Sequence, residues 1–149
     1  MQEALNIPSE EEMIEIFIKL WIENSEKKDI LVREVSNSQK RIDLIRIPKN
    51  SKGRLGPAHA IEFKIKDWRQ CFKQCRGNRV LLPYNWLAIW KGFAHRIKRE
   101  ELEKQGIGLI EVSRNSVEII IKPKKSPFVD EFYYKRIRKK IVSQILEKS

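Results

Sequence analysis

The chain has 149 residues, 41% hydrophobic and 34% charged, without a low-complexity tract, which is typical of one folded domain and excludes a disordered chain. No apolar run reaches the ~20 residues that would cross a membrane, and the N-terminus, MQEALNIPSEEE, lacks an apolar signal core, so we expect a cytoplasmic protein. Lys and Arg outnumber Asp and Glu by 31 to 20, and the net charge of +11 favours a polyanionic partner, although it could also serve solubility alone.

The hydrophobic pattern predicts ten elements that alternate between helices and short strands. In chain order they are a helix at 9–24, strands at 30–35, 41–47 and 60–66, a helix at 67–79, a strand at 86–90, a helix at 95–104, strands at 109–112 and 117–122, and a basic helix at 129–146. Polar turns at 25–28 and 36–40 separate the first elements, and a Gly- and Pro-containing loop at 48–59 precedes the third strand.

The strands at 30–35 and 41–47 are joined by a short polar link, which favours an antiparallel hairpin. Side chains alternate between the two faces of a strand, so Glu34 and Val35 are expected on opposite faces. The hairpin would bring Glu34 alongside Asp43, which is an isolated acid within an apolar run. A buried carboxylate needs a partner or a metal, so this acid is a candidate functional residue.

The strand at 60–66 carries a second isolated acid, Glu62, followed two residues later by Lys64. The two-residue period of a strand places both side chains on one face, about 7 Å apart. Together with Asp43, they suit phosphodiester hydrolysis: carboxylates hold a divalent cation that activates water, and the lysine stabilises charge on the phosphate. On its own the Asp…Glu-x-Lys pattern also fits a solvated pair on an exposed sheet face.

The order of elements together with Ile42-Asp43 and Glu62-Phe63-Lys64 resembles the PD-(D/E)XK nuclease superfamily over residues 9–112. The segments IEFKIKDWRQCFKQC and GIGLIEV are similar to small prokaryotic and archaeal members. The resemblance implies an α/β, restriction-endonuclease-like αβββαβ core with a mixed central sheet flanked by helices. Further C-terminal strands and a basic C-terminal helix would follow at about 117–149, all within one domain at 1–149.

The resemblance also implies roles for particular residues. Asp43 and Glu62 would bind Mg²⁺, for which Mn²⁺ could substitute, with the Phe63 backbone carbonyl as a further ligand. Lys64 would be catalytic, and Gln74 matches a helix glutamine that supports the site in many members.

The chain departs from the superfamily pattern at two positions and leaves a third open. Ile42 replaces the motif proline, and Asn78 stands where some members have a helix tyrosine. Many members add a glutamate from the first helix or the first strand. Glu34, Glu15 and Glu11 are the candidates here, and we favour Glu34 for both catalysis and metal binding because its strand pairs with that of Asp43.

The predicted partner is double-stranded or branched DNA, cut by an endonuclease of the Holliday-junction, repair or restriction-like kind, with a homodimer as one way to cut two strands. A non-catalytic nucleic-acid-binding module and an RNA-directed nuclease are the alternatives. Basic residues expected to contact nucleic acid, rather than only to be solvated, are Arg33, Lys52, Arg54, Lys66, Arg69, Lys73, Arg76, Lys139 and Lys140.

The two cysteines, Cys71 and Cys75, lie four residues apart in a predicted helix and therefore on one helical face. Two thiolates do not complete a zinc site, and neither His59 nor His95 stands at zinc-finger spacing. We therefore expect small buried thiols in the helix core.

Overall fold

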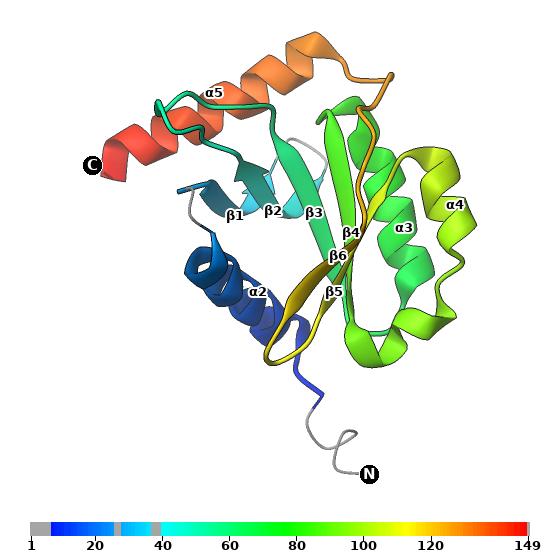
Figure 1. Cartoon of the computed structure of the whole chain (residues 1–149). Helices are drawn as coiled ribbons and strands as arrows, with labels where there is room; N and C mark the ends of the chain where they lie inside the picture. The colour runs from blue at the N-terminus through cyan, green and yellow to red at the C-terminus, as the bar shows by residue number, and fades with distance from the viewer. Residues whose placement is uncertain (1–6, 26–27, 37–39, 149) are drawn as a thin grey trace.

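A computed structural model describes residues 7–25, 28–36 and 40–148, with side chains to residue 145 (Figure 1). Residues 26–27 and 37–39 of the two predicted turns, and residues 1–6 of the N-terminus, lie outside these ranges. The elements are α2 (Glu10–Asn24), β1 (Ile30–Ser36), β2 (Arg41–Ile47), β3 (His59–Lys64), α3 (Trp68–Gly77), η1 (Asn78–Val80), β4 (Tyr84–Trp90), η2 (Lys91–Arg96), α4 (Arg99–Gln105), β5 (Gly108–Val112), β6 (Val117–Ile121) and α5 (Glu131–Lys148).

The six strands form one mixed sheet in the order β1-β2-β3-β4-β5-β6. β1, β2 and β3 pair antiparallel, β3, β4 and β5 pair parallel, and β6 returns antiparallel to β5. The predicted hairpin and mixed sheet are therefore confirmed. The two parallel pairings require crossovers, which α3 and α4 supply.

Helices cover both faces of the sheet (Figure 1). α2 packs on one face, where the fully buried rings of Phe17 and Phe63 meet edge to face at 5.3 Å. On the other face α3 and α4 cover Leu87 and its neighbours, and α5 covers the β1–β2 side, where Ile141 packs with Ile45. Burial of each such side chain contributes about 2–3 kcal/mol before entropy is subtracted.

Helix boundaries follow local capping. Ser9 accepts a hydrogen bond from the Glu12 amide at 3.1 Å, and Asp67 accepts one from the Gln70 amide at 3.1 Å, so both side chains act as predicted helix starts. The predicted single helix at 95–104 is wrong, because Ile97 is extended and separates η2 from α4. Its side chain is buried, which anchors the connection between the two helices.

The alternation predicted for β1 fails at Glu34, whose φ of 54° lies in the left-handed region. This conformation interrupts the two-residue period, so Val35 packs on the same side as Ile30 and Val32 instead of on the opposite one. Across the hairpin Ile42, the partner of Val35, joins the same cluster. The irregularity therefore lies directly opposite Asp43.

The basic C-terminal segment is part of the core and not a loose extension. Ile137 and Ile141 are buried against the sheet. Arg138 donates hydrogen bonds to the carbonyls of Gly56 at 2.7 Å and Leu55 at 3.3 Å, so α5 holds the loop that leads into β3. Within the described ranges, no helix is long and apolar enough to span a membrane.

Candidate active site

The candidate site lies where β2 separates from β3. The two strands pair as far as Leu44 and Ile61, and beyond that point side chains replace the backbone ladder. The Asp43 amide donates to Glu62 Oε1 at 3.2 Å, and the Phe63 amide donates to Asp43 Oδ2 at 3.0 Å. The carboxylates thus occupy the gap that the diverging strands open, and each satisfies a backbone donor beside the other acid.

Glu62 is the most constrained of these groups, since only 2% of it is exposed. Its Oε1 also accepts a hydrogen bond from Asn78 Nδ2 at 3.3 Å, whereas its Oε2 is buried with no partner. Burial, and then the nearby charge of Asp43, raises the pKa of Glu62 to about 8. A buried carboxylate oxygen without a donor is costly, and a bound cation would remove that cost.

Asp43 is affected by the same surroundings. Burial raises the pKa of its carboxyl, while the hydrogen bond from the Phe63 amide opposes that shift. Glu10, at the start of α2, raises the pKa further, and Lys64 lowers it. In the absence of a bound cation, both acids favour the protonated form. A positive charge between them would favour their ionised forms, so the site is suited to a cation.

Lys64, at the end of β3, lies 3.2 Å from the Glu10 carboxylate, and its side chain is 20% exposed. The ion pair sits beside an open pocket of about 380 Å³. Lys66, Asp67 and Gln70 also line the pocket. Solvent can therefore reach the predicted catalytic lysine. Its charge lowers the pKa of Asp43, so Lys64 also lies near that acid.

The residues fit a divalent cation that keeps several waters. The hydrogen bond of the Phe63 amide points toward β2, and a strand residue directs its carbonyl to the same edge as its amide. The Phe63 carbonyl therefore faces the gap between the strands, and its role as a ligand stays a prediction. Asp43, Glu62 and this carbonyl would supply three oxygens, which is enough for Mg²⁺.

A third carboxylate does not join them. Over the described residues, no three Asp, Glu, His or Cys side chains are close enough to share a metal ion. The favoured Glu34 is exposed and lies 3.9 Å from Arg41, because its left-handed backbone takes it out of the strand alternation. Glu11 pairs with Arg33 at 2.7 Å, and Glu15 is exposed. The predicted role of Glu34 as a ligand is corrected accordingly.

Sequence reasoning missed Asn78 and Glu10. Asn78, rather than Gln74, contacts Glu62; Gln74 Oε1 is buried without a hydrogen-bond partner. The sequence feature that could have identified Asn78 is its position one helical turn after Gln74. In the structure Asn78 is buried, as is Cys75. Glu10 precedes the buried Met13 by three residues, which places it on the inward edge of α2.

The predicted buried thiols are confirmed, and one of them contacts a residue of the site. Cys71 and Cys75 are free and buried, and the Cys71 thiol donates to the Glu62 carbonyl at 3.3 Å. Burial raises the pKa of the Cys71 thiol well above its usual value. A neutral thiol is therefore the expected form, which favours a packing role over metal binding.

The predicted basic residues fall into separate groups. Those of the β3–α3 segment are exposed and mostly lie over aromatic rings: Lys66 over Phe93, Arg69 over Trp68, and Arg76 over Phe72, with Lys73 exposed on the same helix. Arg33 differs, because its pairing with Glu11 directs it to the α2 face of the sheet. Of these residues, Lys66 lines the pocket beside Lys64.

The remaining basic residues are exposed near α5. Lys52 and Arg54 lie in a turn whose amides donate to the Asn50 side chain, both at 2.9 Å. Lys139 and Lys140 lie on the outer side of α5, and Lys140 Nζ donates to the Ser36 carbonyl at 2.9 Å. α5 therefore reaches the end of β1, next to the hairpin that carries Asp43.

Comparison with known proteins identifies a fold and no family. No family model and no curated protein matches the chain. A solved structure of SPO1766, a protein of unknown function from Silicibacter pomeroyi, is similar with a TM-score of 0.66 and 14% identity, covering 96% of this chain and 90% of that one. The likeness shows an α/β fold with a six-stranded mixed sheet flanked by helices, the C-terminal one included.

Proposed function

We propose that this chain is a Mg²⁺-dependent deoxyribonuclease of the PD-(D/E)XK superfamily with a restriction-endonuclease-like core. The observation that carries the proposal is the buried Glu62 Oε2, which has no hydrogen-bond donor and adjoins Asp43. An acid that is buried, raised in pKa and next to a second acid is a marker of a functional site rather than of a stable core.

In this proposal each residue has a separate task. Asp43, Glu62 and the Phe63 carbonyl would hold the cation, which would supply an activated water and neutralise charge on the leaving oxygen. Asn78 fixes Glu62 Oε1 and so leaves Oε2 available as a ligand. Lys64 donates to the phosphate as charge develops there, and Glu10 holds its ammonium group in place between turnovers.

The test is cleavage of DNA by the full chain with Mg²⁺, with Mn²⁺ and with a chelator. The substrates are supercoiled plasmid, linear duplex, a four-way junction and a single strand. Asp43→Asn, Glu62→Gln and Lys64→Met should each abolish metal-dependent cleavage, because the first two each remove a cation ligand and the third removes the donor to the phosphate. Glu34→Gln is the matched control, since it removes an exposed acid of the same hairpin, and it should cleave as the wild type does. Cleavage by Asp43→Asn at the wild-type rate would contradict the proposal.

A non-catalytic binding module is the second candidate, because the net charge of +11 and the exposed basic residues suffice for binding alone. The same assay separates the two, since such a module would bind DNA and cut none of the substrates. RNA of matching sequence added to the panel tests whether RNA, and not DNA, is the preferred polymer.

A further inference from the structure

The outer side of α5 and the segment before it carry an exposed group of aromatic rings. Phe132 is 64% exposed, Phe128 55% and Tyr133 49%. Together these three define what we call the α5 aromatic surface. Rings of this size are normally covered, and a group of exposed rings is typical of a binding surface. The rings of Phe132 and Tyr133 are in contact, with centres 5.5 Å apart.

The position of the α5 aromatic surface is fixed by the fold. Phe132 and Tyr133 lie at the start of α5, where their amides donate to the Asp130 side chain at 2.9 and 3.3 Å. The Asp130 amide in turn donates to the Val80 carbonyl at 2.8 Å, which ties the helix start to η1. The rings are thus presented by an anchored helix terminus.

Phe132 lies on the side of α5 that the core does not use, whereas Tyr133, four residues before Ile137, lies at the edge of that side. Ile137 and Ile141 recur at helical spacing and face the sheet. Phe132, Arg136 and Lys139 recur at the same spacing but about half a turn away, so they point outward. The helix therefore has a complete apolar side in the core and a second, aromatic and basic side in solvent.

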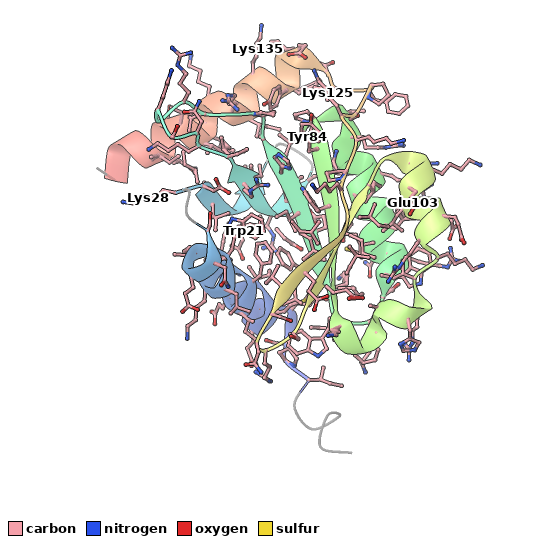
Figure 2. The ribbon with its side chains drawn as sticks, in the orientation of Figure 1. Trp21, Lys28, Tyr84, Glu103, Lys125 and Lys135 are labelled. Carbon is pink, nitrogen blue, oxygen red and sulfur yellow. The ribbon has the colours of Figure 1, made fainter. Side chains whose placement is uncertain are left out.

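Positive charge is interleaved with the rings. The Arg136 guanidinium lies 5.6 Å from the centre of the Phe132 ring, and that of Arg79 lies 4.9 Å from the Phe128 ring. Lys125 and Lys135 project at the same end of the molecule (Figure 2). More than half of Phe128 and Phe132 is exposed despite the arginines, so ring surface remains open to a partner.

This chemistry selects one occupant. A second copy of the chain would bring like charges together, on a protein whose net charge is already +11. An anionic membrane would also accept exposed rings, but the aliphatic side chains of α5 that would deepen such insertion, Ile137 and Ile141, are buried in the core. Flat rings beside arginines suit unpaired bases with their phosphates, whereas bases in a duplex have no free face to stack.

We propose that the outer side of α5 binds single-stranded nucleic acid. Bases stack on Phe132, Tyr133 and Phe128, and the adjoining phosphates lie against Arg136 and Lys139. From Tyr133 the helix runs about 10 Å to Lys140, which contacts Ser36 beside the Asp43 hairpin. If the proposed nuclease function holds, its substrate class contains a single-stranded segment, such as a flap, an overhang or a branch.

Fluorescence anisotropy of the full chain in chelator tests this binding. The probes are a labelled oligothymidylate of about 12 nucleotides and a duplex of the same length. Phe132→Ala with Tyr133→Ala should weaken binding of the single strand by roughly tenfold for each ring and change duplex binding far less. Phe132→Trp should keep the affinity, because it keeps a stacking face. Ile22→Ala, at another exposed apolar residue, is the control that should bind as the wild type does.

Unchanged single-strand affinity in the double variant, with an unchanged thermal midpoint, overturns the proposal. So does binding to anionic phosphatidylserine vesicles, or self-association in light scattering, that the double variant abolishes while oligothymidylate binding stays the same. The result also separates this proposal from the nuclease function. Strand binding without any cleavage would refute only the nuclease, and cleavage without strand binding would refute only the α5 surface.

Discussion

At the scale of single residues, the candidate site is defined by a carboxylate that the fold does not satisfy. Glu62 has donors for one oxygen and none for the other, although its surroundings are packed and buried. Its pKa of about 8 means that the folded protein keeps a proton on this group that the unfolded chain, near 4.5, has lost. An apolar side chain of similar volume at this position would stabilise the folded protein more than this buried carboxylate does.

This linkage predicts the effect of Glu62→Gln on stability in chelator. Between about pH 4.5 and 8 the native state binds more protons at Glu62 than the unfolded state does, so its contribution to the unfolding free energy falls as pH rises. The fall approaches about 1.4 kcal/mol per pH unit. Glutamine keeps an oxygen for the Asp43 and Asn78 donors and cannot ionise, so the variant should gain on the wild type as pH rises.

Urea unfolding of both proteins at pH 5, 6.5 and 8 measures the difference. The predicted pattern is near-equal stability at pH 5 and a more stable variant at pH 8, by a few kcal/mol. Glu34→Gln, which alters an exposed acid, serves as the control and should track the wild type. A difference between the wild type and Glu62→Gln that stays constant with pH would mean that Glu62 is ionised in the native protein even without a cation.

At the scale of elements, the sequence allowed the site's frame to be predicted better than its details. Strand period predicted Glu62 and Lys64 on one side of β3, and Asp43 was expected alongside them. The hydrogen bond from the Asp43 amide to Glu62 Oε1 confirms the approach of Asp43 to Glu62, across the β2–β3 pairing. Glu34 was misplaced because a left-handed residue inside a strand leaves no mark in hydrophobic alternation. Asn78 was noted only as a missing tyrosine, since its contact with Glu62 depends on how α3 crosses the sheet.

The position of η1 after α3 predicts that Asn78 orients the candidate metal ligand. Asn78→Ala would remove the side-chain donor to Glu62 Oε1 and leave the carboxylate free to rotate. If the nuclease function holds, the Mg²⁺ concentration for half-maximal cleavage should rise about 10- to 100-fold. A Mg²⁺ titration of plasmid cleavage measures this. Gln74→Ala, one turn earlier on the same helix, should shift the midpoint much less, and equal shifts would deny Asn78 its special role.

α5 also anchors a loop near β3. The sequence could not predict this role, because the contacts join residues more than 80 positions apart. Arg138 donates to the Gly56 and Leu55 carbonyls, and Tyr134 accepts from the Ala58 amide. The loop at 48–58 is thereby held where it enters β3. The predicted phosphate-contacting loop thus has a structural anchor, whatever its basic residues bind.

Loss of this anchor should destabilise the protein. Arg138→Gln should lower the unfolding free energy by about 1–3 kcal/mol, because two carbonyls lose a charged donor. Lys139→Gln, the exposed neighbour, should change it by less than about 0.5 kcal/mol. Urea unfolding gives both values, and hydrogen exchange should show faster exchange of the Ala58 amide in Arg138→Gln alone. Equal effects of the two substitutions would show that the anchor contributes little.

At the scale of the whole molecule, most of the surplus positive charge lies apart from the candidate site. The candidate site combines two acids with one lysine, whereas the surplus of positive charge lies in exposed residues of α3, the 48–58 loop and α5. If the nuclease function holds, such an arrangement would attract a polyanion over a wide surface and leave a small acidic gap for a cation. The net charge could be predicted from the sequence, but its separation from the acids depends on which helix covers which face.

The salt dependence of duplex binding tests the basic surface of α5 without reference to cleavage. In chelator, log Kobs for duplex DNA should fall linearly with log of the salt concentration, with a slope of about −0.9 for each phosphate contact. Lys139→Gln together with Lys140→Gln should make the slope shallower by about 1 to 2. These side chains project from the outer side of α5, next to the hairpin that carries Asp43. Lys19→Gln, on the exposed side of α2 across the sheet, should leave the slope unchanged. Anisotropy titrations over a series of salt concentrations measure all three slopes. If Lys19 affects the slope as much as the α5 pair does, the positive charge acts as a diffuse field and α5 is not the contact surface.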